Sequence, residues 1–284
     1  MSFSIPSSAS RAARRPLALT LAVGWLVAMG ALALLAPLVA PHGYAEQDLL
    51  ARLSPPVFLG GTADHLLGAD HLGRDVLSRM IYAIRISAIV ALAGTVIGAV
   101  LGTALGVLAA QWRGWFEETV MALVDAQSAL PFLIFALLII AFFGNNLTLF
   151  VLLLGFQGWE RYARLARGLV LDANTRGYAR AARAMGLRDW RVNLVHLAPN
   201  IAGAIAVQFT INLPETILLE AGLSFVGLGI QPPMTSLGLM LNESRGHMVL
   251  HWWLAALPAT VIFLTALAIS LLGDRLRDRL DHTL

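Results

Sequence analysis

The 284-residue chain contains no cysteine and no lysine. The absence of cysteine excludes a disulfide framework, a thiolate zinc site and a cysteine nucleophile. Without lysine, arginine supplies all 20 positive charges, and a phosphate-binding loop of the GxxxxGK[ST] type is excluded. Charged residues make up only 13% of the chain, about half their share in soluble domains, so an ordinary soluble enzyme is excluded as well.

Apolar residues dominate instead, at 58% of the chain with a mean hydropathy of +0.73. A helix that crosses a bilayer needs about 20 mostly apolar residues. Six segments satisfy this requirement: 16–41, 86–112, 119–143, 147–167, 192–214 and 252–273. The two middle segments arise from one uncharged run, 126–159, that a turn at Gly144-Asn145-Asn146 divides. The sequence therefore predicts an all-α membrane protein with six transmembrane helices.

One further uncharged stretch, 221–242, is not expected to be a seventh span. It contains the run GLSFVGLGIQPP, whose glycines and paired prolines cannot easily satisfy a membrane-spanning backbone. We expect an extracytoplasmic loop over 221–250 or a re-entrant segment. The first apolar run follows three arginines, as in a signal peptide, but it is too long for one and is expected to be a retained helix.

The arginines predict the orientation of the chain, because cytoplasmic loops carry an excess of positive charge. Six spans with a cytoplasmic N-terminus place 15 of the 20 arginines inside, in the segments 1–15, 113–118, 161–191 and 274–284. Both termini are therefore expected in the cytoplasm, as a tail 1–15 and a tail 274–284 around a transmembrane domain 16–273. The basic charge then faces lipid headgroups, and no nucleic-acid partner is expected.

The cytoplasmic loop 168–191 is predicted to form two short helices bent at a glycine. Tyr178, Ala181, Ala182 and Met185 have the spacing of one helix face. Gly186 then suits a left-handed helix end, and an apolar face continues through Leu187 and Trp190. Two interpretations remain open, a basic amphipathic segment on the lipid surface and a helix that docks in a groove of a cytoplasmic partner.

The predicted outer loop 42–84 carries residue types that bind metals, namely His65, Asp70, His71 and Asp75. Glycines interrupt this run, and Asp75 stands where it would cap a helix beginning at residue 76. We therefore expect structural roles for these residues and no metal site.

Carboxylates near the membrane are functional candidates, because their burial in lipid is costly. Asp125 and Glu160 are expected near the cytoplasmic interface, as interfacial or arginine-paired carboxylates, and Asp125 is also a candidate pathway or gate residue. Glu215 and Glu220 are expected near the outer end of the fifth span, where they border an aqueous pathway or anchor a loop. Glycines at 94, 98, 102 and 106 predict close helix packing, more readily within the chain than between chains.

The sequence offers no catalytic constellation. There is no HExxH pair, and no nucleophile set is evident inside the spans, so an intramembrane enzyme is disfavoured and no catalytic residue is expected. A gradient-driven carrier would show inverted repeats and ion sites at mid-membrane, which are not apparent. Sensitivity of uptake to ATP depletion rather than to an uncoupler would separate a carrier from an ATP-driven transporter.

Four segments in order resemble a known family, the permease subunits of binding-protein-dependent ABC importers, and within it the second permease of the dipeptide, oligopeptide and nickel group. They are HLLGADHLGRDVLSRMIYAIRIS (65–87), WERYARLARGLVLDANTRGYARAARAMGLRDWRVNLVHLAPN (159–200), LLEAGLSFVGLGIQPPMTSLGLMLNESR (218–245) and LLGDRLRDRLD (271–281). The resemblance covers residues from about 10 to 282. One departure is Arg180, which stands where the cytoplasmic motif of the family has glutamate.

This resemblance implies the type I importer architecture in a bacterial inner membrane. It implies a heterodimer with a sister permease, two ATPase subunits that hold ATP and magnesium, and an extracytoplasmic substrate-binding protein; this chain itself would bind no cofactor. The substrate would be a dipeptide or short oligopeptide, with nickel or its chelates, glutathione and opines as alternatives. The implied ATPase contacts are Tyr178, Arg180, Ala181, Ala182, Met185, Gly186, Leu187 and Trp190, and the implied docking residues for the binding protein are His71, Gly73, Arg74 and Asp75.

Overall fold

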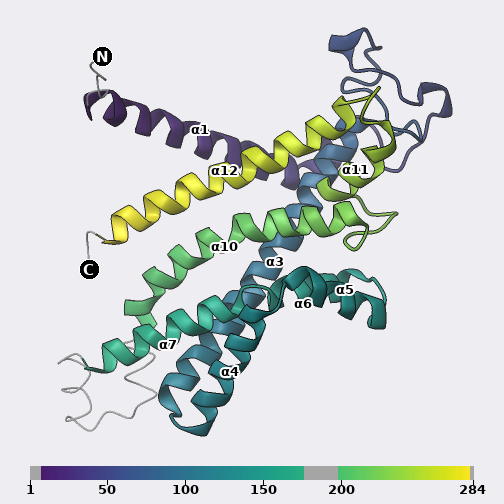
Figure 1. Cartoon of the computed structure of the whole chain (residues 1–284). Helices are drawn as coiled ribbons and strands as arrows, with labels where there is room; N and C mark the ends of the chain where they lie inside the picture. The colour runs from purple at the N-terminus through teal and green to yellow at the C-terminus, as the bar shows by residue number, and fades with distance from the viewer. Residues whose placement is uncertain (1–7, 176–197, 282–284) are drawn as a thin grey trace, which may run out of the picture.

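The computed structural model describes residues 8–175 and 198–281, and within these ranges it is helical, with no β-strand. Figure 1 shows long helices crossing the molecule, with an irregular loop at the end where α3 begins. The helices are α1 (Ser8–Leu34), α2 (Ala36–Val39), α3 (Val76–Gln111), α4 (Trp115–Ala129), α5 (Phe132–Phe143), α6 (Leu147–Phe156), α7 (Trp159–Thr175), α10 (Ala198–Val226), α11 (Leu237–Ser244) and α12 (Trp253–Asp281). Short 3-10 turns lie at Leu49–Ala51, Val57–Leu59 and Arg245–His247.

Four of the described helices, α1, α3, α10 and α12, are long and apolar enough to cross a membrane. The predicted single helix over 119–143 is wrong, because α4 and α5 meet there at a bend of 96°. Pro131 causes the bend: it pushes the preceding residue, Leu130, into an extended conformation and cannot donate a backbone hydrogen bond.

The predicted helix over 147–167 is also divided, into α6 and α7. Gln157 is extended and Gly158 has a φ of +94°, a conformation that favours glycine and ends the helical path. The turn expected at Gly144-Asn145-Asn146 is confirmed. Gly144 has a φ of +77°, and the Asn146 side chain accepts a hydrogen bond from the Leu149 N–H to cap α6.

Several segment limits differ from those expected. The loop predicted as 42–84 ends at Asp75, because α3 begins at Val76. Asp75 caps α3 as expected, its Oδ2 accepting a hydrogen bond from the Ser78 N–H at 2.8 Å. The helix expected to end near 214 runs through Pro214 to Val226, so the first residues of the 221–250 segment are helical. Likewise α1 begins inside the predicted tail 1–15, and α12 extends to Asp281 within 274–284.

Helix α3 lies at the centre of the described structure, packed against α7, α6, α10, α1 and α4. Its four predicted packing glycines face α6 and α7. A Cβ at Gly94 would lie 2.8 Å from the Leu154 Cβ, and one at Gly102 would lie 2.1 Å from the Trp159 carbonyl oxygen. The small residues thus allow close backbone approach within the chain.

Candidate functional site

The predicted ATPase contacts lie outside the described residues, because the segment 176–197 is not described. This concerns Tyr178, Arg180, Ala181, Ala182, Met185, Gly186, Leu187 and Trp190. Three groups of polar side chains remain to be considered, two at the loop-bearing end of the molecule and one along α7.

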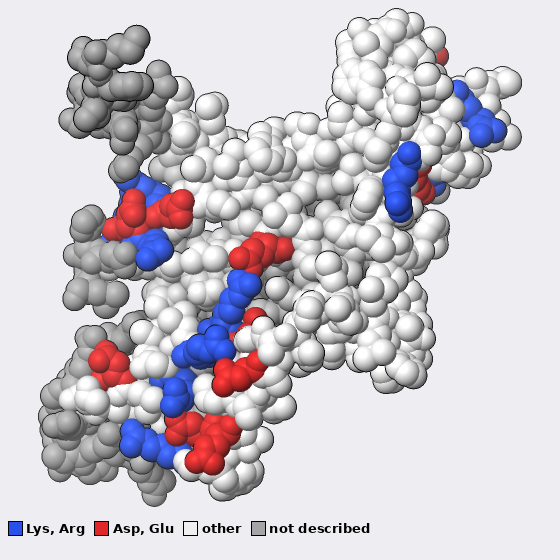
Figure 2. Space-filling model, in the orientation of Figure 1, with Lys and Arg blue, Asp and Glu red and all other residues white. Residues whose placement is uncertain are grey.

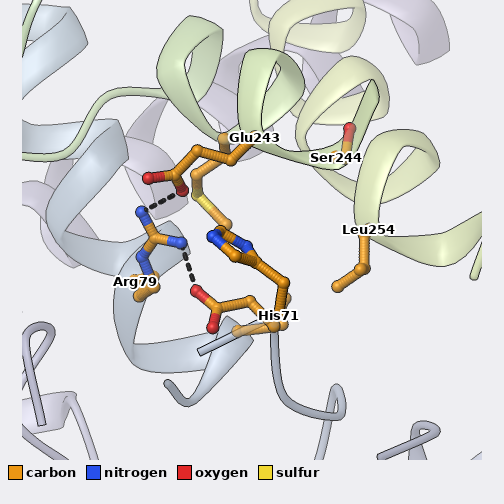
Figure 3. A pocket seen from close by; sticks show the side chains of 8 residues that line it. His71, Arg79, Glu243, Ser244 and Leu254 are labelled. Carbon is orange, nitrogen blue, oxygen red and sulfur yellow. Dashed lines mark hydrogen bonds and ion pairs between the residues drawn. The ribbon is translucent and has the colours of Figure 1, made fainter. Parts of the chain in front are cut away.

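A buried charge network joins the 42–75 loop to α3 and α11. The Arg79 guanidinium donates to Asp70 and contacts Glu243 Oε2 at 2.7 Å. Arg74 bridges the same carboxylates, with Nε 2.7 Å from Asp70 Oδ2 and Nη2 3.1 Å from Glu243 Oε2. Figure 3 shows Arg79 and Glu243 pointing toward one another, with His71 beside them. Two arginines and two carboxylates therefore balance one another in an enclosed space.

The pKa values in this network follow its charges. Burial raises the pKa of the Asp70 carboxyl, but the guanidiniums of Arg79 and Arg74 and the N–H groups of Arg74 and Leu72 outweigh it, so that this pKa lies below its ordinary 3.8. For His71, partial burial lowers the pKa below 6.5, against the opposing influence of the Asp70 and Glu243 carboxylates. Asp70 is thus held ionised, and His71 is held neutral.

The four residues that were expected to dock the binding protein lie in or beside this network. Arg74 is mostly buried in it, and Asp75 is buried as the cap of α3. Gly73 has a φ of +77°, and a Cβ there would lie 1.8 Å from the Asp48 carbonyl oxygen. His71 is partly exposed and stacks on His247, with ring centroids 5.9 Å apart. Among these four residues, His71 has a partly exposed side chain, while the other three shape the loop.

Glu220 forms the second polar group, and its side chain is buried, with the residue 1% exposed. The Ser224 hydroxyl donates to its Oε1 at 2.9 Å, and the hydroxyls of Ser87 and Ser236 lie near this carboxylate. The Ser224 hydroxyl oxygen accepts a hydrogen bond from the Ile230 N–H. In the same way Ser87 accepts the Leu237 N–H, and Ser236 accepts the Leu239 N–H.

Glu220 therefore anchors the turn after α10 to α3 and α11. Of the two roles left open by the sequence, a pathway border and a loop anchor, these contacts support the anchor. Its position is also deeper in the helix than expected, since α10 continues to Val226.

The third group, which we call the α7 ladder, is a row of three ion pairs. Arg161 donates to Glu215 of α10. Arg164 Nη2 lies 3.1 Å from Asp125 Oδ1, and Arg167 Nε lies 2.7 Å from Glu117 Oε1, both on α4. The arginines recur every three residues, so they follow one side of the helix.

Figure 2 shows positive and negative side chains beside one another in a row over α10, α7 and α4. The pairing of Asp125 with arginine is confirmed by its contact with Arg164. Glu160 is buried beside the ladder, with the Arg161 Nε 3.8 Å away. The opposite face of α7, including Tyr162, Ala163 and Ala166, is buried.

Several participants were not predicted from the sequence. Glu117 and Glu243 were passed over because they lie outside the uncharged runs, where a carboxylate is unremarkable. Ser87 and Ser236 lie 149 positions apart, and nothing in their spacing indicates that both approach Glu220. The signal that the sequence offered for these participants was the presence of polar residues inside otherwise apolar stretches.

Membrane-length helices around a central α3 are those of a multi-pass membrane protein. A family model described as "Binding-protein-dependent transport system inner membrane component" matches residues 102–284. The chain belongs to this family, and it is a multi-pass protein of the bacterial inner membrane. Its curated relatives are transport permeases rather than enzymes.

Two relatives illustrate the similarity. The Di/tripeptide transport system permease protein DppC of Pseudomonas aeruginosa is 40% identical over 253 residues, which cover 89% of this chain and 84% of that protein. The Glutathione transport system permease protein GsiD of Pectobacterium atrosepticum is 39% identical over 225 residues, which cover 79% of this chain and 75% of that protein.

The fold matches a solved transporter. A chain from a structure titled "Inward facing conformations of the MetNI methionine ABC transporter" aligns with a TM-score of 0.55 and 20% identity, covering 72% of this chain and 95% of that chain. The predicted type I ABC importer architecture is confirmed by this match.

Proposed function

We propose that this chain forms half of the translocation pathway of an ATP-driven importer for dipeptides or short oligopeptides. The names of its relatives support the substrate class, because they include a di/tripeptide permease and dipeptide permeases. The single observation that carries the proposal in the structure is the α7 ladder.

The ladder lies where the predicted fourth span meets the cytoplasm, and charged side chains there are stable when they face water or another subunit rather than lipid. Side-chain exposure is 52% for Arg164 and 75% for Asp125, and charged groups in membrane segments line cavities and substrate paths rather than lipid. The ladder face is therefore assigned to the aqueous space between this chain and a sister permease.

The chemistry of the ladder suits a zwitterionic cargo. A short peptide carries one ammonium and one carboxylate, and the ladder offers both carboxylates and guanidiniums in alternation. Because the pairs are partly exposed, exchanging a partner within the ladder for a charged end of the peptide costs little free energy. The path can then conduct the peptide without holding it tightly.

The remaining partners follow from the sequence pattern. The loop 168–191 is proposed to seat its apolar face in an ATPase subunit, with the ends of the chain in the cytoplasm and the 42–75 loop facing a substrate-binding protein. The ATPases hold ATP and magnesium. This chain works by differential stabilisation of two conformations by its bound partners.

The test is uptake of labelled dialanine by membrane vesicles that contain the assembled importer and its binding protein. Arg164→Gln should lower ATP-dependent uptake by up to about fivefold, since partly exposed charged contacts are worth about 0.2–1 kcal/mol. Co-purification of the ATPase subunits should be unchanged. Arg113→Gln is the matched control, because it removes an exposed arginine just before α4 and outside the ladder, and its uptake should equal that of the wild type.

Two results would contradict the proposal. Wild-type uptake by the Arg164→Gln importer would remove the ladder from the pathway. Uptake abolished by an uncoupler but not by ATP depletion would indicate a gradient-driven carrier. A third result, competition by glutathione rather than by dialanine, would keep the importer but select the glutathione relatives as the guide to its substrate.

A further inference from the structure

Two histidines and an aspartate converge where α3 begins. His42 follows α2, His65 lies within the 42–75 loop, and Asp75 is the cap residue of α3. His65 Nδ1 lies 3.2 Å from Asp75 Oδ1, and His42 Nδ1 lies 4.0 Å from Asp75 Oδ2. One ligand atom from each of the three residues lies within 4.8 Å of the others.

These separations suit a small divalent metal ion. Zinc binds imidazole nitrogen and carboxylate oxygen at about 2.0–2.2 Å, which places neighbouring ligand atoms of a tetrahedral site about 3.3–3.5 Å apart. The His65–Asp75 distance already matches this spacing, and His42 needs to approach by a few tenths of an ångström. Two histidines and one carboxylate leave a fourth position for water.

The His42 ring supplies an independent observation. Its Nδ1 is buried and makes no hydrogen bond within the described residues, although it points toward Asp75. A buried polar atom without a partner requires an explanation, of which an ion is one. A bound metal would give this nitrogen the partner that the chain does not provide.

The surrounding contacts hold the ligands in place. Asp75 Oδ2 accepts the Ser78 N–H, and the Ser78 hydroxyl accepts the His42 backbone N–H at 3.0 Å. The rings of His42 and His65 lie 5.3 Å apart between centroids. Such outer contacts orient metal ligands and fix their geometry.

Charge distinguishes this cluster from its neighbour. Asp70, His71 and Glu243 also bring three ligand atoms together, but both carboxylates already contact the guanidiniums of Arg74 and Arg79. A cation would be repelled there. In the described structure the guanidiniums of Arg74 and Arg79 are directed to Asp70 and Glu243, which leaves the Asp75 carboxylate to the two histidines.

We propose that His42, His65 and Asp75 bind a divalent transition metal ion, with zinc as the metal that this donor set fits best. The ion fastens the chain after α2 and the middle of the 42–75 loop to the first turn of α3. This proposal does not depend on the substrate of the transporter.

The experiment uses the assembled importer, purified in detergent through a tag without histidine and stripped with a chelator. Zinc is titrated against a chromophoric chelator, and the melting temperature is recorded with and without zinc. We expect one tight site per copy of this chain, and a higher melting temperature when it is filled. His42→Ala should abolish this site and the zinc-dependent stabilisation.

His42→Ala is the informative variant, because the His42 side chain makes no hydrogen bond within the described residues, and folding does not depend on one. His247→Ala is the matched control, a histidine at the same end of the molecule but outside the cluster; it should retain zinc binding. The proposal is overturned if the wild type binds no zinc at micromolar concentration, or if His42→Ala binds it as the wild type does.

Discussion

The charge network at the 42–75 loop and the α7 ladder are built from the same residue types in opposite surroundings. In the network, the side chains of Arg79 and Asp70 are 3% and 7% exposed. In the ladder, Arg164 and Asp125 are 52% and 75% exposed. Both regions join helices that are distant in sequence. The free-energy cost of losing one contact is expected to be much higher in the buried network than in the exposed ladder.

The contrast indicates which region stays fixed. Removing one partner from a buried ion pair leaves an uncompensated charge and destabilises strongly, whereas exposed pairs contribute little and exchange partners readily. The network is therefore a permanent fastening between the loop, α3 and α11. The ladder is a surface whose pairs can open and close as the transporter moves.

The largest loss of stability is expected for Arg79→Ala in the buried network. The substitution leaves Asp70 and Glu243 facing each other with Arg74 alone, and the free energy of unfolding should fall by about 3–5 kcal/mol. Thermal unfolding in detergent, followed by fluorescence size-exclusion chromatography, measures the change. Arg164→Gln in the ladder is the control and should change stability by about 1 kcal/mol or less. Equal losses in the two variants would show that burial does not separate the regions.

An intermediate effect is expected at Glu220, whose carboxylate is buried without an arginine. Glu220→Ala removes the acceptor of the Ser224 hydroxyl from a buried cluster that includes Ser87 and Ser236, and it should lower stability by about 1–3 kcal/mol, the cost of leaving buried polar groups unpaired. Glu220→Gln keeps an oxygen in the same place and should lose less. Limited proteolysis after α10 reports whether the turn is released. A glutamine variant as unstable as the alanine variant would show that charge, and not hydrogen bonding, is what the serines require.

The smallest effect is a dependence of stability on pH at His71. The groups around its ring are Asp70, Glu243, Arg74, Arg79 and His247. Because the folded pKa lies below 6.5, the unfolded chain takes up a proton that the folded chain does not, and stability is lost as pH falls from 6.5 toward the folded pKa. Melting temperatures between pH 7 and 5 should therefore fall more steeply in the wild type than in His71→Gln. Parallel curves would remove His71 as the source.

The fold was predictable where long apolar runs and local caps determine it. The apolar helices α1, α3, α10 and α12, the turn at Gly144-Asn145-Asn146 and the Asp75 cap could be read from adjacent residues. The breaks at Pro131 and Gly158 could not, because length and hydropathy alone make 119–143 and 147–167 resemble complete spans. A proline or a glycine inside an apolar run can end a helix or be accommodated in one, as Pro214 is in α10.

The site was less predictable, because its contacts join residues that are far apart in the chain. Arg79 and Glu243 belong to α3 and α11, and the pairing of Arg161 with Glu215 depends on how α7 and α10 cross. The sequence indicated that Glu215 and Asp125 needed partners but not which arginine each would meet. His42 was overlooked for the same reason, since nothing near it in sequence marks it as a neighbour of His65.

Helix α3 has 36 residues, which corresponds to a length of about 54 Å. Its first turn is clamped by Arg79, and glycines farther along let α7 sit against its backbone. A stiff helix that is fixed at its first turn moves most at its other end. Each degree of tilt about the fixed end moves the far end of α3 by about 1 Å. A few degrees of reorientation at the loop-bearing end thus suffice to shift α7 and its arginines by the width of a hydrogen bond.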